Sequence, residues 1–104
     1  MSVNSLDVVR APVLGQNTPN PFNASTTIPY SIQLPGRYEL TVYDILGRKT
    51  ATLFSGYQSS GEHRVVWNGK DENGAGAASG FYFYVLSEKE GMGVIASKRL
   101  LLMK

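Results

Sequence analysis

The sequence contains no cysteine. This absence excludes disulfides, thiolate nucleophiles and cysteine-based metal sites. Histidine is nearly absent too, because His63 is the only one. No serine or acidic residue lies at a spacing from His63 that indicates a catalytic triad or a histidine metal site. We therefore expect no enzymatic activity, no bound metal and no other cofactor.

Long apolar runs and long charged runs are missing as well. No window reaches the length of a membrane-spanning helix, so we expect no membrane-spanning segment. The net charge is +2, from ten Lys and Arg against eight Asp and Glu, and the charges are interspersed. Such a distribution does not form the basic patch that nucleic-acid binding requires, so no nucleic-acid partner is expected.

The chain is rich instead in turn residues and in short runs of strand formers. Eleven glycines and five prolines among 104 residues indicate many tight turns. No 3.6-residue periodicity is present, and short alternating segments predict a single all-β domain, a seven-stranded antiparallel β-sandwich. The predicted strands cover residues 6–14, 26–32, 38–43, 49–54, 63–67, 80–86 and 94–104.

Residues 80–86 form the most apolar of these predicted strands, and alternation divides them into two faces. One face carries Tyr82, Tyr84 and Leu86, and the other carries Phe81, Phe83 and Val85. Because both faces are apolar, we expect a central strand covered on each side, or a strand whose second face meets a partner. Phe81, Phe83 and Val85 are the candidate partner patch if they face outward.

The N-terminal part is expected to be irregular. Residues 1–13 are predicted to be a linker or a first edge strand, because Pro12 cannot donate to a ladder. Residues 15–23 cannot form regular structure, since Pro19 and Pro21 fix their own φ and make the residues before them extended. Phe22, at the end of this segment, is expected to plug an opening of the core.

Two further clusters have a functional and a structural interpretation. Trp67 with Tyr57, Tyr82 and Tyr84 could line a sugar-binding platform, but their spacing at alternate positions favours packing between sheets. Residues 71–74 (Asp-Glu-Asn-Gly) match a fragment of a calcium loop but lack the remaining ligands, so a turn is favoured.

Four segments in order, residues 16–30, 43–48, 61–74 and 78–104, resemble one family. They are similar to the C-terminal sorting domains of type IX secretion cargo and to the related Ig-like domain named after the flagellar hook-capping protein. The residues that carry the resemblance include Asn20, Pro21, Phe22, Tyr43, Asp44, Gly47, Arg48, Trp67, Gly80, Tyr82 and Tyr84.

The resemblance implies a non-catalytic, seven-stranded Ig-like sandwich over residues 14–104. In many Bacteroidota such domains direct a secreted protein through the periplasm and the type IX secretion system to the cell surface or the exterior. The implied partners are the type IX translocon, its processing machinery and an upstream cargo domain. The implied recognition residues lie in the final strand and are Lys98, Arg99, Leu100, Leu102 and Lys104.

Two alternatives remain open at this point. The chain could be an accessory carbohydrate- or protein-binding Ig-like module of an extracellular enzyme. It could also be a structural scaffold domain of the flagellar hook-cap type.

Overall fold

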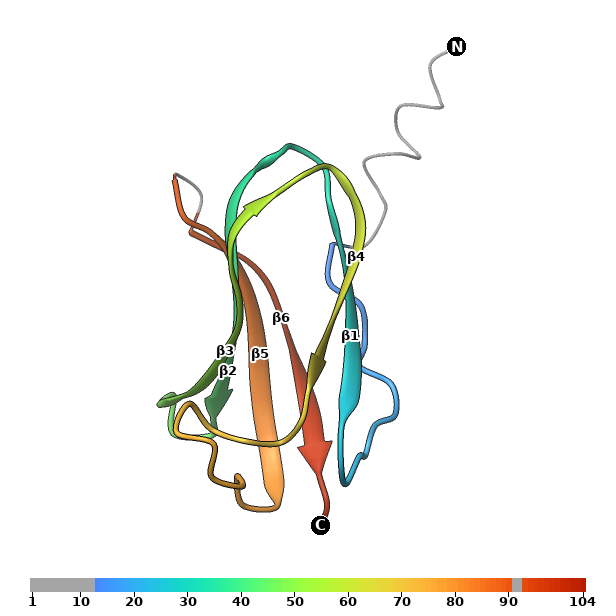
Figure 1. Cartoon of the computed structure of the whole chain (residues 1–104), viewed down its shortest axis with the longest axis vertical. Helices are drawn as coiled ribbons and strands as arrows, with labels where there is room; N and C mark the ends of the chain where they lie inside the picture. Colours follow the sequence, from blue (N-terminus) through green and yellow to red (C-terminus); the bar gives the residue numbers. More distant parts are fainter. Residues whose placement is uncertain (1–12, 91–92) are drawn as a thin grey trace.

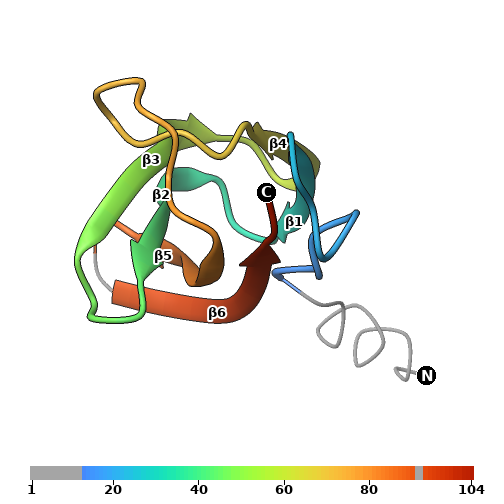
Figure 2. The same ribbon diagram turned by 90° about the horizontal axis from the view of Figure 1, so that it is seen from below.

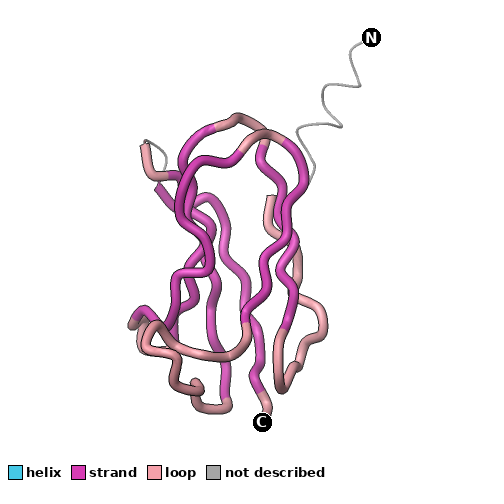
Figure 3. Tube along the Cα trace, viewed as in Figure 1, coloured by secondary structure: helices cyan, strands magenta, loops and turns pink. Residues whose placement is uncertain are grey.

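The computed structural model describes residues 13–90 and 93–104. Within these residues the chain forms six strands and no helix (Figures 1 and 3). Every strand pair is antiparallel, so the all-β prediction is confirmed. The strands are β1 (Thr26–Ile32), β2 (Gly36–Asp44), β3 (Lys49–Gln58), β4 (Gly61–Trp67), β5 (Gly80–Glu88) and β6 (Gly93–Leu102).

The predicted count of seven strands is wrong for the described part of the chain. The missing strand was predicted over residues 6–14, most of which lie outside the described residues. At its end, Leu14 makes only an isolated bridge to Tyr30. β3 is longer than predicted, because it continues past Phe54 to Gln58 and replaces part of the expected polar connection.

The strands form two sheets that face each other across one core. The larger sheet has the order β3-β2-β5-β6, and the smaller sheet pairs β1 with β4. Figures 1 and 2 show β1 and β4 on one side and the other four strands curving around the opposite side. Residues 13–18 lie along β1 on the edge that β4 leaves free, so they extend the smaller sheet without forming a regular strand.

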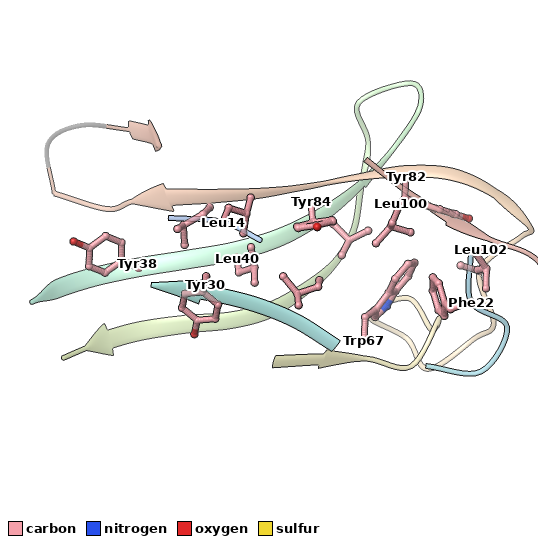
Figure 4. Packing of buried hydrophobic residues seen from close by; sticks show 14 of the residues in the cluster. Leu14, Phe22, Tyr30, Tyr38, Leu40, Trp67, Tyr82, Tyr84, Leu100 and Leu102 are labelled. Atoms are coloured by element: carbon pink, nitrogen blue, oxygen red, sulfur yellow. The ribbon is translucent and has the colours of Figure 1, made fainter. Parts of the chain in front are cut away.

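The alternation read from the sequence matches the buried faces of the strands. A side chain on every second residue enters the core because successive residues of a strand point to opposite faces. Trp67, which is 1% exposed, packs against Phe22 and Tyr82 near one end of the core (Figure 4). One alternating face of β1, β2, β5 and β6 is buried, and its residues are Ile28, Tyr30, Ile32, Tyr38, Leu40, Val42, Tyr82, Tyr84, Leu86, Leu100 and Leu102.

The segment before β1 connects both sheets. Its backbone bonds to β1 through Gly15 and Thr18, and it then crosses to β6, where Phe22 bridges Leu102 in parallel. Pro19 and Pro21 lack the N–H groups that a continuous ladder would need, so the pairing is limited to isolated bridges. Phe22 is 3% exposed, which confirms that it fills an opening of the core.

A buried hydroxyl group fastens this segment to the opposite sheet. The Tyr84 hydroxyl on β5 donates to the Gly15 carbonyl at 2.7 Å and accepts from the Asn17 backbone N–H at 2.9 Å. The Asn17 side chain, also buried, donates to the Thr26 hydroxyl at 3.0 Å. Burial raises the pKa of Tyr84 to about 12. One side chain thus supplies both partners that the irregular backbone would otherwise lack.

Two other inward tyrosines also use their hydroxyls to bind the backbone of a connection between strands. The Tyr38 hydroxyl donates to the Leu34 carbonyl at 2.6 Å, in the turn between β1 and β2. The Tyr82 hydroxyl donates to the Ala78 carbonyl at 2.6 Å, at the end of the long loop before β5. Each ring lies in the core while its hydroxyl reaches a backbone group at the margin, which is how buried tyrosines commonly satisfy their polar atom.

Replacing Tyr84 by Phe should destabilise the fold and reduce its sensitivity to alkali. The loss of the hydroxyl leaves the Asn17 N–H and the Gly15 carbonyl without this partner, at an expected cost of ~1–3 kcal/mol in the free energy of unfolding. Above the ordinary tyrosine pKa of 10.0, the unfolded chain releases a proton that folded Tyr84 keeps up to about 12. The stabilisation linked to the raised Tyr84 pKa is therefore fully present below pH 10 and is lost as the pH rises to about 12. The free energy of unfolding should fall less steeply over this range in Tyr84→Phe.

Urea titrations followed by the fluorescence of Trp67, the only tryptophan, measure both effects. Tyr57→Phe is the matched control, because Tyr57 is 62% exposed. Equal unfolding midpoints for Tyr84→Phe and Tyr57→Phe would contradict the structural role of the Tyr84 hydroxyl.

Candidate interaction surface

The outward face of β5 carries the predicted partner patch. Phe81 and Phe83 are 46% and 40% exposed, and Val85 between β2 and β6 is partly exposed. These side chains therefore face outward, which was the condition for the partner patch, and the alternative of a strand covered on both faces does not match their exposure. Large aromatic side chains in such positions mark a surface for interaction more often than an isolated exposed leucine does.

The residues predicted for recognition in the last strand fall into two groups. Arg99 and Lys104 are exposed and Lys98 is half-buried, so these charges are accessible on the folded domain. Leu100 and Leu102 are 1% and 0% exposed, because they face the core between the sheets. In the folded domain only the charged residues are in a position to contact a partner directly, and recognition by a translocon remains a prediction.

The edge of β6 is partly closed by the segment before β1. The Asn20 side-chain oxygen accepts from the Leu101 N–H at 2.9 Å. Phe22 donates its N–H to the Leu101 carbonyl at 3.1 Å and accepts from the Met103 N–H at 2.8 Å. The exposed Pro21 lies between these two residues. The Asn-Pro-Phe run of the expected family motif therefore holds the final strand in place.

The Tyr-Asp-Ile-Leu-Gly-Arg run forms the turn between β2 and β3. Asp44 accepts from the backbone N–H groups of Leu46 and Arg48 at 2.9 Å each, and its other oxygen meets the Arg48 guanidinium at 3.0 Å. These groups, first the Arg48 backbone N–H, hold the pKa of Asp44 below its usual value. Gly47 has φ 82°, which confirms the predicted positive φ and explains why glycine stands there.

The sequence motif at the start of β5 also has a conformational basis. Gly80 adopts φ 149°, a backbone conformation that other residues rarely adopt. It ends the long loop from β4 and begins the strand that places Tyr82 inward and Phe81 outward.

The structure buries most of the aromatic residues considered for a sugar platform and forms the turn predicted at residues 71–74. Trp67, Tyr82 and Tyr84 are at most 7% exposed, so they cannot present a platform to a sugar. In the loop after β4, the Asp71 carboxylate accepts from the N–H groups of Asn73 and Ala75, which is the predicted turn. Across residues 13–90 and 93–104, no group of three or more His, Asp or Glu side chains is placed to hold a metal ion.

His63 has a structural environment rather than a catalytic one. Its ring stacks on Tyr30 with 5.4 Å between the ring centroids, and its Nε2 atom donates to the Ser59 carbonyl at 2.8 Å. It therefore supports the turn between β3 and β4.

The burial of Asn17 and the cross-strand neighbour of Tyr43 had no clear signal in the sequence. Asn17 is buried at 2% exposure, yet no periodicity marks a polar residue in an irregular segment as buried. Tyr43 lies in register with Phe83 and thus belongs to the outward face of the larger sheet. Its place follows from the alternation of β2, but its neighbour can be known only from the pairing of β2 with β5.

With this geometry established, comparisons with known proteins identify the family. The model of the FlgD Ig-like domain matches residues 22–91, which is more than half of the chain. The chain belongs to the FlgD Ig-like domain family. Among solved structures, the fold resembles FlgD from Xanthomonas campestris, described for its role in hook capping in flagellar assembly, with a TM-score of 0.59 and 21% identity. No curated protein matches the chain.

The comparison with FlgD also defines how far the likeness extends. It covers 86% of this chain but 63% of that FlgD chain, so the chain spans less than two thirds of the flagellar protein's length. FlgD Ig-like domains form a structural, scaffold family and are not known as catalysts. The comparisons support the hook-cap part of the expected resemblance, and they do not support the type IX sorting domain. No helix in the part of the chain described has the length and apolar character needed to cross a bilayer.

Substitution should destabilise the domain strongly in the buried group of β6 and hardly at all in the exposed group. Leu102→Ala should lower the free energy of unfolding by ~2–5 kcal/mol, because it leaves a cavity beside Phe22 and Gly69. Arg99→Gln should change it by less than about 0.5 kcal/mol, since the side chain is exposed. Thermal and urea unfolding of both variants measures the difference. A tolerated Leu102→Ala would show that Leu102 is not part of the core.

Proposed function

We propose that the chain is a non-catalytic structural module of the hook-cap type, which supports a protein assembly through its surfaces. The observation that carries this proposal is the match of the FlgD Ig-like domain model to residues 22–91. The fold similarity to the hook-capping FlgD agrees with it but, at 21% identity, speaks for the fold alone.

The construction of the domain suits a scaffold. One continuous core joins both sheets, and side chains from the irregular segment, from β5 and from β6 all contribute to it. The tyrosine hydroxyls hold the connections to this core. A domain built in this way keeps its surfaces in fixed relative positions, which is what a structural module contributes to an assembly.

A second candidate function is sorting of a secreted protein. In this proposal the domain follows an upstream cargo domain and is recognised by the type IX translocon and its processing machinery, and the protein reaches the outer cell surface or the exterior through the periplasm. The observation that favours it is the exposure of Arg99 and Lys104 at the end of a strand that Phe22 and Asn20 hold in place.

The hook-cap proposal predicts that this domain can replace its counterpart. A chimera in which the chain substitutes for the aligned part of Xanthomonas campestris FlgD should restore hook formation above the level of a strain without that part. Electron microscopy of hooks and swimming in soft agar measure this. The same chimera with Leu102→Ala is the control, because this substitution weakens the core and leaves every surface residue unchanged. A chimera that is folded and abundant but forms no hooks would contradict the proposal.

The sorting proposal predicts that surface charge, and not only the fold, directs export. A reporter fused to the chain should reach the medium of a type IX-secreting bacterium, and Arg99→Gln combined with Lys104→Gln should retain it in the periplasm. Arg64→Gln, a neutralised exposed charge on β4, is the matched control. Deleting residues 94–104 is less informative, because it removes Leu100 and Leu102 from the core. Periplasmic retention of the unaltered fusion would remove this candidate.

A further inference from the structure

One cross-strand row crosses the whole outward face of the larger sheet. Lys49 on β3 lies opposite Tyr43 on β2, Tyr43 lies opposite Phe83 on β5, and Phe83 lies opposite Arg99 on β6. The row therefore reads cation, aromatic, aromatic, cation. With strands ~4.8 Å apart, the backbone positions of the two cations are roughly 14 Å apart.

Apolar side chains border this row on its side toward the turn between β2 and β3. Phe81 and Leu101 form the next pair on β5 and β6. Ile45 and Leu46, in the turn, are 68% and 72% exposed, and a shallow hollow lies between them and Phe81. Exposed apolar side chains thus extend from the middle of the sheet to the turn, with Asp44 and Arg48 also lining the hollow, whereas isolated exposed apolar residues would need no explanation.

The charges of this face are not balanced within the molecule. The acidic side chains on and beside this face already have partners. Glu39 on β2 meets Lys89 at 2.9 Å, Asp44 at the adjoining turn meets Arg48 at 3.0 Å, and Glu90 lies 3.9 Å from Arg37. Neither Arg99 nor Lys49 makes an ion pair within residues 13–90 and 93–104. The pKa of Glu39 is lowered chiefly by the hydrogen bond from Lys89, and the more distant charge of Lys49 adds to this effect. The charges that remain for an incoming molecule are therefore both positive.

Arg99 is placed to stack on an aromatic ring and to bind an anionic group at the same time. Its guanidinium lies over the Phe81 ring, 4.9 Å from the ring centroid. A guanidinium stacked in this way keeps its N–H donors at the edge, where a carboxylate can accept two of them. The stacking also fixes the side chain, so less conformational freedom is lost when a carboxylate binds.

We propose that this face binds an amphipathic segment of a partner protein, whose apolar side chains contact Phe81, Phe83 and Tyr43 and whose carboxylates reach Arg99 and Lys49. Charge complementarity selects this occupant over a second copy of the chain. Two copies packed face to face would bring cationic row ends together, and like charges in an interface are unfavourable. This inference does not rest on the hook-cap or the sorting proposal, because it concerns a surface that either module would carry.

Selection from a displayed library of random 16-residue peptides tests the proposal with the intact chain as the bait. Peptides that bind the chain, after depletion on Phe83→Ser, should be enriched in Asp or Glu together with Leu, Ile, Val or Phe. Enrichment of basic peptides, or no enrichment, would overturn the proposal.

Binding of the best selected peptide should then depend on the row. Phe83→Ser and Arg99→Gln should each weaken its affinity ~10-fold or more, corresponding to about 1.4 kcal/mol. The matched control is Val66→Ser, because Val66 is 57% exposed on β4 of the other sheet and should leave the affinity unchanged. Trp67 fluorescence and unfolding midpoints show whether each variant is folded.

Two other outcomes would assign the face to a different occupant and overturn the proposal. One is binding to phosphatidylglycerol vesicles that Phe83→Ser abolishes, with no binding of acidic peptides. The other is a dimer in sedimentation equilibrium that Phe83→Ser dissociates. A peptide of the selected sequence with its acidic residues changed to Lys should bind at least ~10-fold more weakly than the original, and equal binding would also contradict the proposal.

Discussion

The hydrogen bonds of the Tyr84 hydroxyl are the interaction on which the rest of this structure depends. The segment before β1 contains two prolines and cannot complete a ladder, yet it must cross from the smaller sheet to the larger one. Tyr84 reaches from β5 to Gly15 and Asn17 and satisfies both backbone groups in the interior. Beyond this point the segment continues to β6, where Phe22 fills the end of the core and bridges Leu102. An unpaired polar group at this depth would instead cost more than a single hydrogen bond contributes.

β5 combines the two tasks of the domain on its opposite faces. Inward, its tyrosines fill the core and hold both the segment before β1 and the loop from β4. Outward, its phenylalanines remain accessible and lie between basic side chains from β3 and β6. Because the two sets alternate along one strand, the position of the outward aromatics is as rigid as the core behind them. A surface supported in this way needs little reorganisation on binding, and this favours affinity.

Much of the fold could be predicted from alternation, and much of the candidate surface could not. The inward faces of β1, β2 and β5 follow from period-two patterns such as Ile28, Tyr30 and Ile32. β3 was harder, because register shifts opposite Leu40 and Val42 interrupt its alternation. Phe81 and Phe83 were recognisable as an outward pair, but the row from Lys49 to Arg99 depends on the pairing of β2 with β5, which are distant in the sequence, and on the register of both hairpins. Leu100 and Leu102 belong to the core for the same reason that Leu40 does, although the family resemblance suggested recognition.

The outward face must also avoid non-specific association with other chains when nothing is bound to it. Exposed aromatic residues on a flat sheet promote association, and proteins limit this with charges at the edges of the sheet. Arg99 lies over Phe81 and Lys49 stands at the other end of the row, so both edges of the aromatic pair carry the same charge. The arrangement covers part of the apolar surface and disfavours contact between identical faces. The same two cations attract a carboxylate, so the groups that keep the face soluble also select what binds to it.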